Sequence, residues 1–232
     1  MFTYKSKIYG RKNKKVVFLL SGWGFDRRFF SPVAFALVLA GYQCIVYSYD
    51  ASILSPNIKN TKARFELVKK EILSRVELCK YHGDEPYAIF GTSLGALLTL
   101  MVVNETPEFK KIVLNLTGSD IAEIIWSWEI FRPAFKKILQ TTGITIEQLK
   151  EDWKAISPIN NISNLNHRDI LIYLSERDQV IPYNQGRKFL EDLKKRNYKF
   201  TLVINKKLRH VSAAAYNLIN FPIYIKFLRT SK

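Results

Sequence analysis

Cysteine is scarce in this sequence, and its scarcity excludes two classes of protein. The 232 residues contain two cysteines, Cys44 and Cys79, which are too few and too scattered for a disulfide framework or a cysteine-ligated metal site. Cys44 lies in an apolar pattern typical of a strand, so we expect a buried thiol with a structural role. The sequence therefore predicts a protein of a reducing compartment, with no metal and no cofactor.

Long apolar runs are absent as well. The longest, residues 94–103, fits a buried helix, whereas a membrane-spanning helix needs about 18 apolar residues. The stretch from Met1 to Lys15 is polar and basic, without the apolar stretch and cleavage site of a secretory signal. We therefore expect a cytoplasmic protein, and the 47% apolar content over this length indicates one domain, residues 1–232.

Acidic residues are few, 20 against 36 basic ones, which gives a formal net charge of +16. Such a charge suits proteins that bind nucleic acid or anionic membranes. Here the basic residues are spread from Lys5 to Lys232, mostly as pairs such as Lys14-Lys15, with no basic-aromatic binding motif. A solvated surface is the favoured interpretation, and nucleic acid is not an expected partner. The charge would favour acidic substrates, and an acidic carrier protein is left open as a partner.

Short apolar runs alternate with longer helical patterns, which predicts an α/β fold with a mostly parallel sheet and helices on both faces. The expected strands are Val16–Leu20, Gln43–Tyr49, Tyr87–Phe90, Lys111–Leu116, Asp169–Leu174 and Phe200–Asn205. The expected helices are Pro32–Ala40, Thr61–Tyr81, residues 94–104, Gln185–Arg196 and Ser212–Leu228.

One stretch, residues 120–165, breaks this alternation. It has helical patterns but no good strand, and it contains three of the four tryptophans, Trp126, Trp128 and Trp153. A helical cap inserted between two strands would explain it, and its aromatic residues, Trp126 and Phe131 in particular, would then line a substrate pocket. Ordinary interior packing is the alternative explanation for these aromatics.

The segment Gly91-Thr92-Ser93-Leu94-Gly95 matches the pattern G-x-S-x-G. It follows an apolar strand and begins an apolar helix. On such a sharp turn a serine is lifted above the edge of the sheet, and the glycines allow the close approach of neighbouring backbone. The helix amino terminus favours developing negative charge. These features predict that Ser93 is a nucleophile.

At this motif the chain resembles the α/β-hydrolase family, and the resemblance extends from about Lys15 to the C-terminus. In that family a segment after an earlier strand supplies half of the oxyanion hole. The matching segment is Ser21-Gly22-Trp23-Gly24-Phe25, so the resemblance implies that the Trp23 and Leu94 amides stabilise the oxyanion. Many relatives have histidine where this chain has Ser21, but the donors are main-chain groups.

A nucleophilic serine needs a base, and the sequence has three histidines. His82 and His167 each precede a strand, whereas His210 follows the last one, where the resemblance places the catalytic histidine. The acid implied by the resemblance is Asp178, four residues before Pro182. Asp120, just after an earlier strand, is a position that some relatives use instead.

Together these residues predict a serine hydrolase that cleaves carboxylic esters through an acyl-enzyme, with Ser93, His210 and Asp178 as the triad. A thioesterase and an esterase for carrier-bound methyl esters are the alternatives, because the Gly-Trp-Gly segment also resembles such esterases. A rival of another class is a catalytically silent protein that binds an anionic partner.

Overall fold

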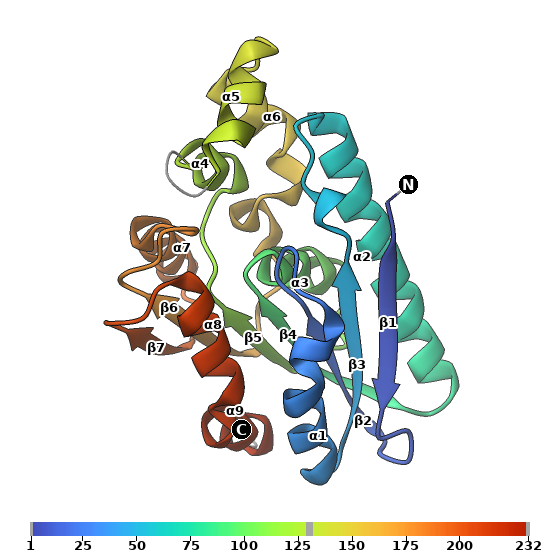
Figure 1. Ribbon diagram of the computed structural model, residues 1–232. Helices are drawn as coiled ribbons and strands as arrows, with labels where there is room; N and C mark the ends of the chain where they lie inside the picture. The colour runs from blue at the N-terminus through green and yellow to red at the C-terminus, as the bar shows by residue number, and fades with distance from the viewer. Residues whose placement is uncertain (1, 129–131, 231–232) are drawn as a thin grey trace.

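The strands of this protein are apolar on both faces, which is typical of a sheet covered on both sides. The computed structural model describes residues 2–128 and 132–230. Within them a seven-stranded sheet has the order β1-β3-β2-β4-β5-β6-β7, and all pairs are parallel except β1 with β3 (Figure 1). The strands are β1 (Tyr4–Tyr9), β2 (Lys15–Leu20), β3 (Tyr42–Tyr49), β4 (Glu85–Thr92), β5 (Lys111–Asn115), β6 (Asp169–Ser175) and β7 (Thr201–Asn205).

Helices cover both faces of this sheet. The described helices are α1 (Ser31–Leu39), α2 (Ile58–Tyr81), α3 (Leu94–Glu105), α4 (Ile121–Trp126), α5 (Pro133–Thr141), α6 (Ile146–Asp152), α7 (Tyr183–Lys195), α8 (His210–Ile219) and α9 (Phe221–Arg229). Short 3₁₀ turns complete the described elements: η1 (Arg27–Phe30), η2 (Ala51–Ile53), η3 (Lys154–Ile156) and η4 (Pro158–Asn161). None of the helices in the described ranges is both long and apolar enough to cross a membrane.

The core is divided by the sheet into two layers. Phe18 and Ile45 point to the side of α2, α3 and α7, whereas Val17 and Val46 point to the side of α1, α8 and α9. Because side chains alternate along a strand, neighbouring apolar residues fill both layers. Cys44 lies in the second layer and is fully buried, as predicted, and this burial raises the pKa of its thiol to about 12.

The predicted fold class is confirmed, and the six expected strands correspond to β2 through β7. Strand β1 was not among them. It is an edge strand, with Tyr4 and Ile8 packed on the α2 side and Tyr9 on the other. The prediction of a single helix over Ser212–Leu228 was wrong, because α8 ends at Ile219 and α9 begins at Phe221. Pro222, in the first turn of α9, cannot continue a preceding helix.

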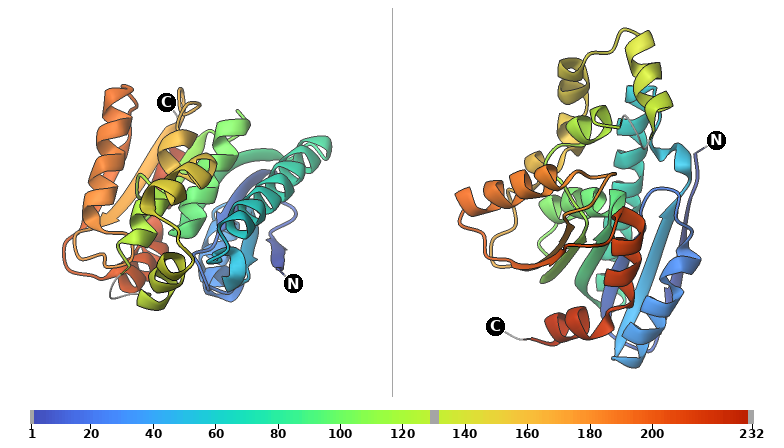
Figure 2. Two further views of the ribbon diagram at one scale, coloured as in Figure 1. Left: turned by 90° about the horizontal axis from the view of Figure 1, so that it is seen from above. Right: turned by 60° about the vertical axis from the view of Figure 1, so that its left-hand side comes forward.

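Between β5 and β6 the described residues form helices and 3₁₀ turns but no strand. In Figure 1 helices α4, α5 and α6 lie at the top of the molecule, beyond the carboxyl ends of β4 and β5, and the right panel of Figure 2 shows them projecting from the body. Trp153 anchors this stretch, since its indole N–H donates to the Ile58 carbonyl of α2 at 3.0 Å. The stretch therefore stands over the sheet edge where Ser93 lies.

Candidate active site

Ser93 occupies a strained turn between β4 and α3. Its backbone has φ 54° and ψ −118°, a left-handed conformation rare for a residue with a side chain. Glycines make the turn possible, because a Cβ on Gly91 would lie 2.2 Å from the Gly95 carbonyl oxygen, and one on Gly95 would lie 2.3 Å from that of Leu20. The amide of Ser93 donates to the Asn115 carbonyl of β5 at 2.8 Å, which fixes the turn to the neighbouring strand.

His210, the first residue of α8, connects two buried side chains. Its Nε2 lies 2.9 Å from the Ser93 Oγ, and its Nδ1 lies 2.7 Å from Asp178 Oδ2. With the proton on Nδ1, the ring donates to the carboxylate and accepts from the serine hydroxyl. The three side chains come from the carboxyl ends of β4, β6 and β7, and the structure therefore brings together the three residues that the sequence suggested.

The Asp178 carboxylate is held by the backbone as well as by histidine. Its Oδ1 accepts from the amides of Val180 and Ile181, each at 2.8 Å. Asp120, the alternative acid, has another role: its Oδ1 accepts from the amides of Ala122 and Glu123 and caps α4. The carboxylate that the structure places against the imidazole is that of Asp178.

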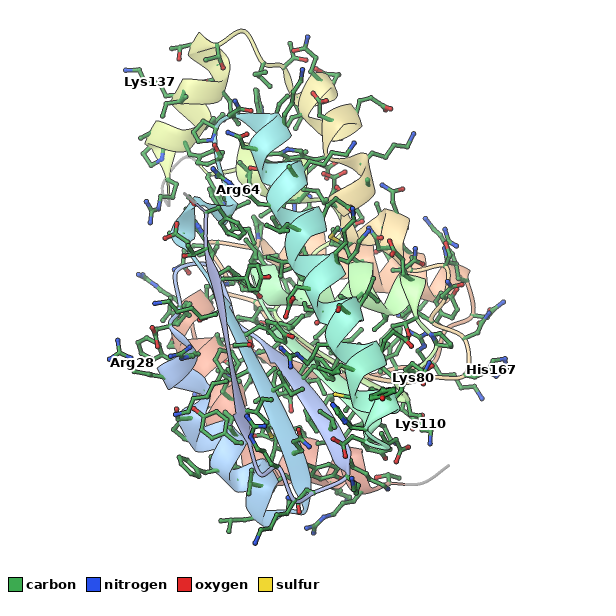
Figure 3. All side chains as sticks on the ribbon, turned by 90° about the vertical axis from the view of Figure 1, so that its right-hand side faces the viewer. Arg28, Arg64, Lys80, Lys110, Lys137 and His167 are labelled. Atoms are coloured by element: carbon green, nitrogen blue, oxygen red, sulfur yellow. The ribbon has the colours of Figure 1, made fainter. Side chains whose placement is uncertain are left out.

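The other two histidines lie away from this site. His82 is exposed where α2 ends, with its ring beside Tyr81, and His167 is exposed in the loop before β6. Figure 3 shows His167 near Lys80 and Lys110, at the opposite end of the molecule from Lys137 of α5. Neither histidine is placed to contact Ser93.

The loop after β2 lies directly against the nucleophile. A Cβ on Gly22 would be in ordinary van der Waals contact with the Thr92 carbonyl oxygen, at 3.4 Å, and with the Ser93 Cβ, at 3.5 Å, so this loop passes directly beside the nucleophile. Trp23 and Leu94 both line the cavity that contains Ser93. Leu94 is the first residue of α3, and an amide at that position has no acceptor within its own helix.

That cavity is small and apolar, with a volume of about 40 Å³. Besides Ser93 it is lined by Trp23, Leu54, Leu94, Leu97, Ile121, Ile124, Ile125, Trp128, Val180 and Ile181. The tryptophan that the 120–165 stretch contributes to this lining is Trp128. Trp126 is half-buried, with the Lys136 ammonium 5.8 Å from the ring centroid. Phe131 lies outside the described residues.

Glu123 of α4 connects the helical stretch to the body. Its carboxylate accepts hydrogen bonds from Lys150 of α6 and from Gln185 and Lys188 of α7. Burial alone would raise its pKa, but these three bonds outweigh burial and lower it to about 2. Nothing in the sequence singles out this group, because its partners are distant in the chain.

A second group that sequence reasoning missed lies beneath the histidine helix. Asn217 of α8 donates to the Asn115 side-chain oxygen at 2.8 Å, and Asn115 donates to the Ala214 carbonyl at 3.2 Å and to Thr92 Oγ1 at 3.3 Å. Asn115 and Asn217 are both buried. This network attaches the helix that carries His210 to the ends of β4 and β5. The polar Asn115 within the apolar run 111–116 was its one visible signal in the sequence.

Metal-ligating side chains do not gather elsewhere in the described residues. No group of three or more His, Cys, Asp or Glu side chains within residues 2–128 and 132–230 could hold a metal ion. The reactive groups that the structure brings together at Ser93 are the serine hydroxyl, the His210 imidazole and the Asp178 carboxylate.

Comparison with known proteins points to one class of enzyme. The model of the prolyl oligopeptidase family matches residues 77–228. No curated protein matches the sequence as a relative.

Three solved structures illustrate the likeness of fold. An acylaminoacyl peptidase in complex with Z-Gly-Gly-Phe-chloromethyl ketone shares 16% identity with a TM-score of 0.68 over 94% of this chain. An esterase from Exiguobacterium antarcticum shares 13% identity with a TM-score of 0.64 over 98% of this chain. A monoacylglycerol lipase from Paleococcus ferrophilus shares 14% identity with a TM-score of 0.59 over 97% of this chain. The chain spans 37% of the peptidase, but 96% of the esterase and 98% of the lipase.

Proposed function

This chain belongs to the prolyl oligopeptidase family and is a serine hydrolase with the α/β-hydrolase fold, and we propose that it cleaves carboxylic esters of short acyl groups. The observation that carries the proposal is the hydrogen-bonded series Ser93–His210–Asp178, which lies beside an apolar cavity.

The proposed reaction proceeds in two steps. His210 Nε2 accepts the proton of the Ser93 hydroxyl while its oxygen attacks the ester carbonyl, and the protonated imidazole then returns the proton to the leaving alcohol. Water then attacks the acyl-enzyme. His210 accepts a proton from this water and returns it to the Ser93 oxygen as the carboxylic acid leaves. Asp178 holds the ring with Nδ1 protonated and stabilises the imidazolium, and the amides of Trp23 and Leu94 donate to the oxyanion.

The size of the cavity supports short acyl groups. A volume of about 40 Å³ is small beside the roughly 300–1,000 Å³ of pockets that enclose drug-sized ligands. An acetyl or propionyl group needs little movement of the lining, whereas an octanoyl chain needs several side chains to move. The apolar lining also favours an uncharged acyl group over a charged one.

A series of p-nitrophenyl esters tests this proposal. Acetate and butyrate should be hydrolysed with a higher kcat/KM than octanoate, and Ser93→Ala should abolish the turnover of all three. The matched acetyl p-nitroanilide and acetyl thioester measure the peptidase and thioesterase alternatives. If either is hydrolysed faster than the ester, the substrate class is wrong even though the serine mechanism stands. No turnover of any of them, with Ser93 unlabelled by a fluorophosphonate, would support a silent binding protein.

A further inference from the structure

Positive charge is distributed unevenly along this chain. Residues 1–49 contain eight basic residues and one acidic residue, and residues 193–232 contain ten basic residues and no acidic one. The long middle part, residues 50–192, contains eighteen basic and nineteen acidic residues and is close to neutral. The net charge of +16 therefore comes from the two ends of the sequence.

The fold places helices from these two ends on the same face of the sheet. Helix α1 comes from the first segment, α8 and α9 come from the last, and α1 contacts both of them. The right panel of Figure 2 shows α1 and α8 side by side. Lys5 and Lys7 of β1 are exposed and point to this face, since they alternate with Tyr4 and Ile8, which pack toward α2. The basic residues of this face therefore come from the first segment, whereas Lys194 and Lys195 of the last segment lie at the end of α7, on the other side of the sheet.

The same face exposes apolar side chains. Phe35 and Leu39 of α1 are 59% and 90% exposed, and Tyr216 and Ile219 of α8 are 49% and 60% exposed. Helices α1 and α8 contain no Lys, Arg, Asp or Glu. An apolar groove of about 220 Å³ lies between the two helices, with Phe29 (64% exposed) at its edge. Grouped exposure of this kind marks an interaction surface.

Basic side chains surround this apolar patch. Arg27 and Arg28 precede Phe29 in η1; Arg28 forms an ion pair with Asp26 at 3.1 Å, and Figure 3 shows it at the outer edge of the body. Arg11 and Lys12 are exposed in the turn near the end of α1, where Asn13 donates to the Val38 carbonyl. We call the apolar residues and this basic surround the α1–α8 face; its members are Lys5, Lys7, Arg11, Lys12, Arg27, Arg28, Phe29, Phe35, Leu39, Tyr216 and Ile219.

We propose that the α1–α8 face binds the surface of an anionic lipid bilayer. Phe35, Leu39 and Ile219 enter the headgroup region, and the basic surround lies against anionic headgroups. Charge complementarity favours this occupant over a second copy of the chain, because self-association would bring two basic surrounds together. Nucleic acid would use the basic residues but would leave the aliphatic side chains exposed. The proposal does not depend on the proposed reaction.

Cosedimentation with vesicles tests the proposal. The protein should bind vesicles of phosphatidylcholine mixed with phosphatidylglycerol, bind far less to pure phosphatidylcholine, and dissociate as salt is raised. Phe35→Ser/Leu39→Ser should lower the partition coefficient about tenfold or more, because it removes the apolar contacts. Lys7→Gln/Lys12→Gln should lower it about tenfold, with a shallower dependence on salt. Neither double variant touches the triad, so hydrolysis of a soluble ester should stay unchanged.

Matched variants on the other face are the controls. Leu67→Ser/Tyr81→Ser removes two exposed apolar side chains of α2, and Lys62→Gln/Lys70→Gln removes two exposed charges of the same helix. Both should bind vesicles within about twofold of the parent protein. Equal losses from α2 and from the α1–α8 face would mean adsorption by net charge alone and would overturn the proposal. It would equally be overturned by binding to duplex DNA without binding to vesicles, or by a dimer that Phe35→Ser/Leu39→Ser dissociates.

Discussion

The rings of Trp23 and Trp128 are stacked, with centroids 5.5 Å apart and 13° between their planes. Trp23 belongs to the loop after β2, and Trp128 follows α4 in the stretch between β5 and β6. The Trp128 indole N–H donates to the Val180 carbonyl at 2.9 Å, two residues after Asp178. One side chain thus connects the helical stretch, the proposed oxyanion loop and the loop of the acid.

Replacing Trp128 with alanine should alter acyl-chain preference. The substitution removes one wall of the cavity beside Ser93, and each extra methylene that then becomes buried contributes about 0.8 kcal/mol, or roughly fourfold in kcat/KM. We expect the ratio of butyrate to acetate turnover to rise severalfold. Trp126→Ala is the matched control, and its ratio of butyrate to acetate turnover should stay unchanged. An equal change of this ratio in both variants would favour the expectation that Trp126 lines the pocket.

Substitution should show which of the two candidate acids orients His210. Asp178→Asn removes the charge that holds the imidazole and should lower kcat by up to about 10⁴-fold while the fold is kept. Asp120→Asn keeps a side chain that can cap α4, so both activity and stability should change little. A large kcat loss in Asp120→Asn, with Asp178→Asn active, would reverse the assignment.

The sequence predicted much of the fold because buried parallel strands are continuous apolar runs that end in turns. It also suggested Ser93, His210 and Asp178, since each follows such a strand and the ends of parallel strands meet at one edge. It did not predict β1, whose alternating polar residues suit an edge strand. Which tryptophan of 120–165 faces the cavity depends on tertiary packing, and so does the pairing of Asn115 with Asn217, which are far apart in the chain.

Removal of the Asn217 amide should destabilise the protein and loosen the histidine helix. Asn217→Ala leaves the buried oxygen of Asn115 without this donor, at a cost of about 1–3 kcal/mol in the free energy of unfolding. Thermal unfolding should show a Tm lowered by several degrees, and kcat should fall more than KM changes. Asn220→Ala, just beyond the same helix, is a control expected to preserve both. A normal kcat in a destabilised Asn217→Ala protein would show that this network stabilises the fold but does not position His210.

Glu123 should contribute to stability in a defined range of pH. Its carboxylate has a lower pKa in the folded protein, about 2 against an ordinary 4.5, so the stabilisation is fully present above pH 4.5. It is lost as pH falls from there through about 2. Glu123→Gln should therefore unfold at a lower Tm than the parent at pH 6, and the difference should shrink as the pH is lowered below 4.5. A difference independent of pH would show that the ion pairs contribute nothing.

Covalent labelling shows whether Ser93 is a nucleophile that His210 activates. A fluorophosphonate probe followed by peptide mass spectrometry should place the label on Ser93 in the parent protein. Ser93→Ala should take up no label, and His210→Ala should be labelled far more slowly, with ester turnover reduced on the order of 10⁴-fold or more in each variant. Label on another serine, or equal labelling of the parent and His210→Ala, would contradict the account.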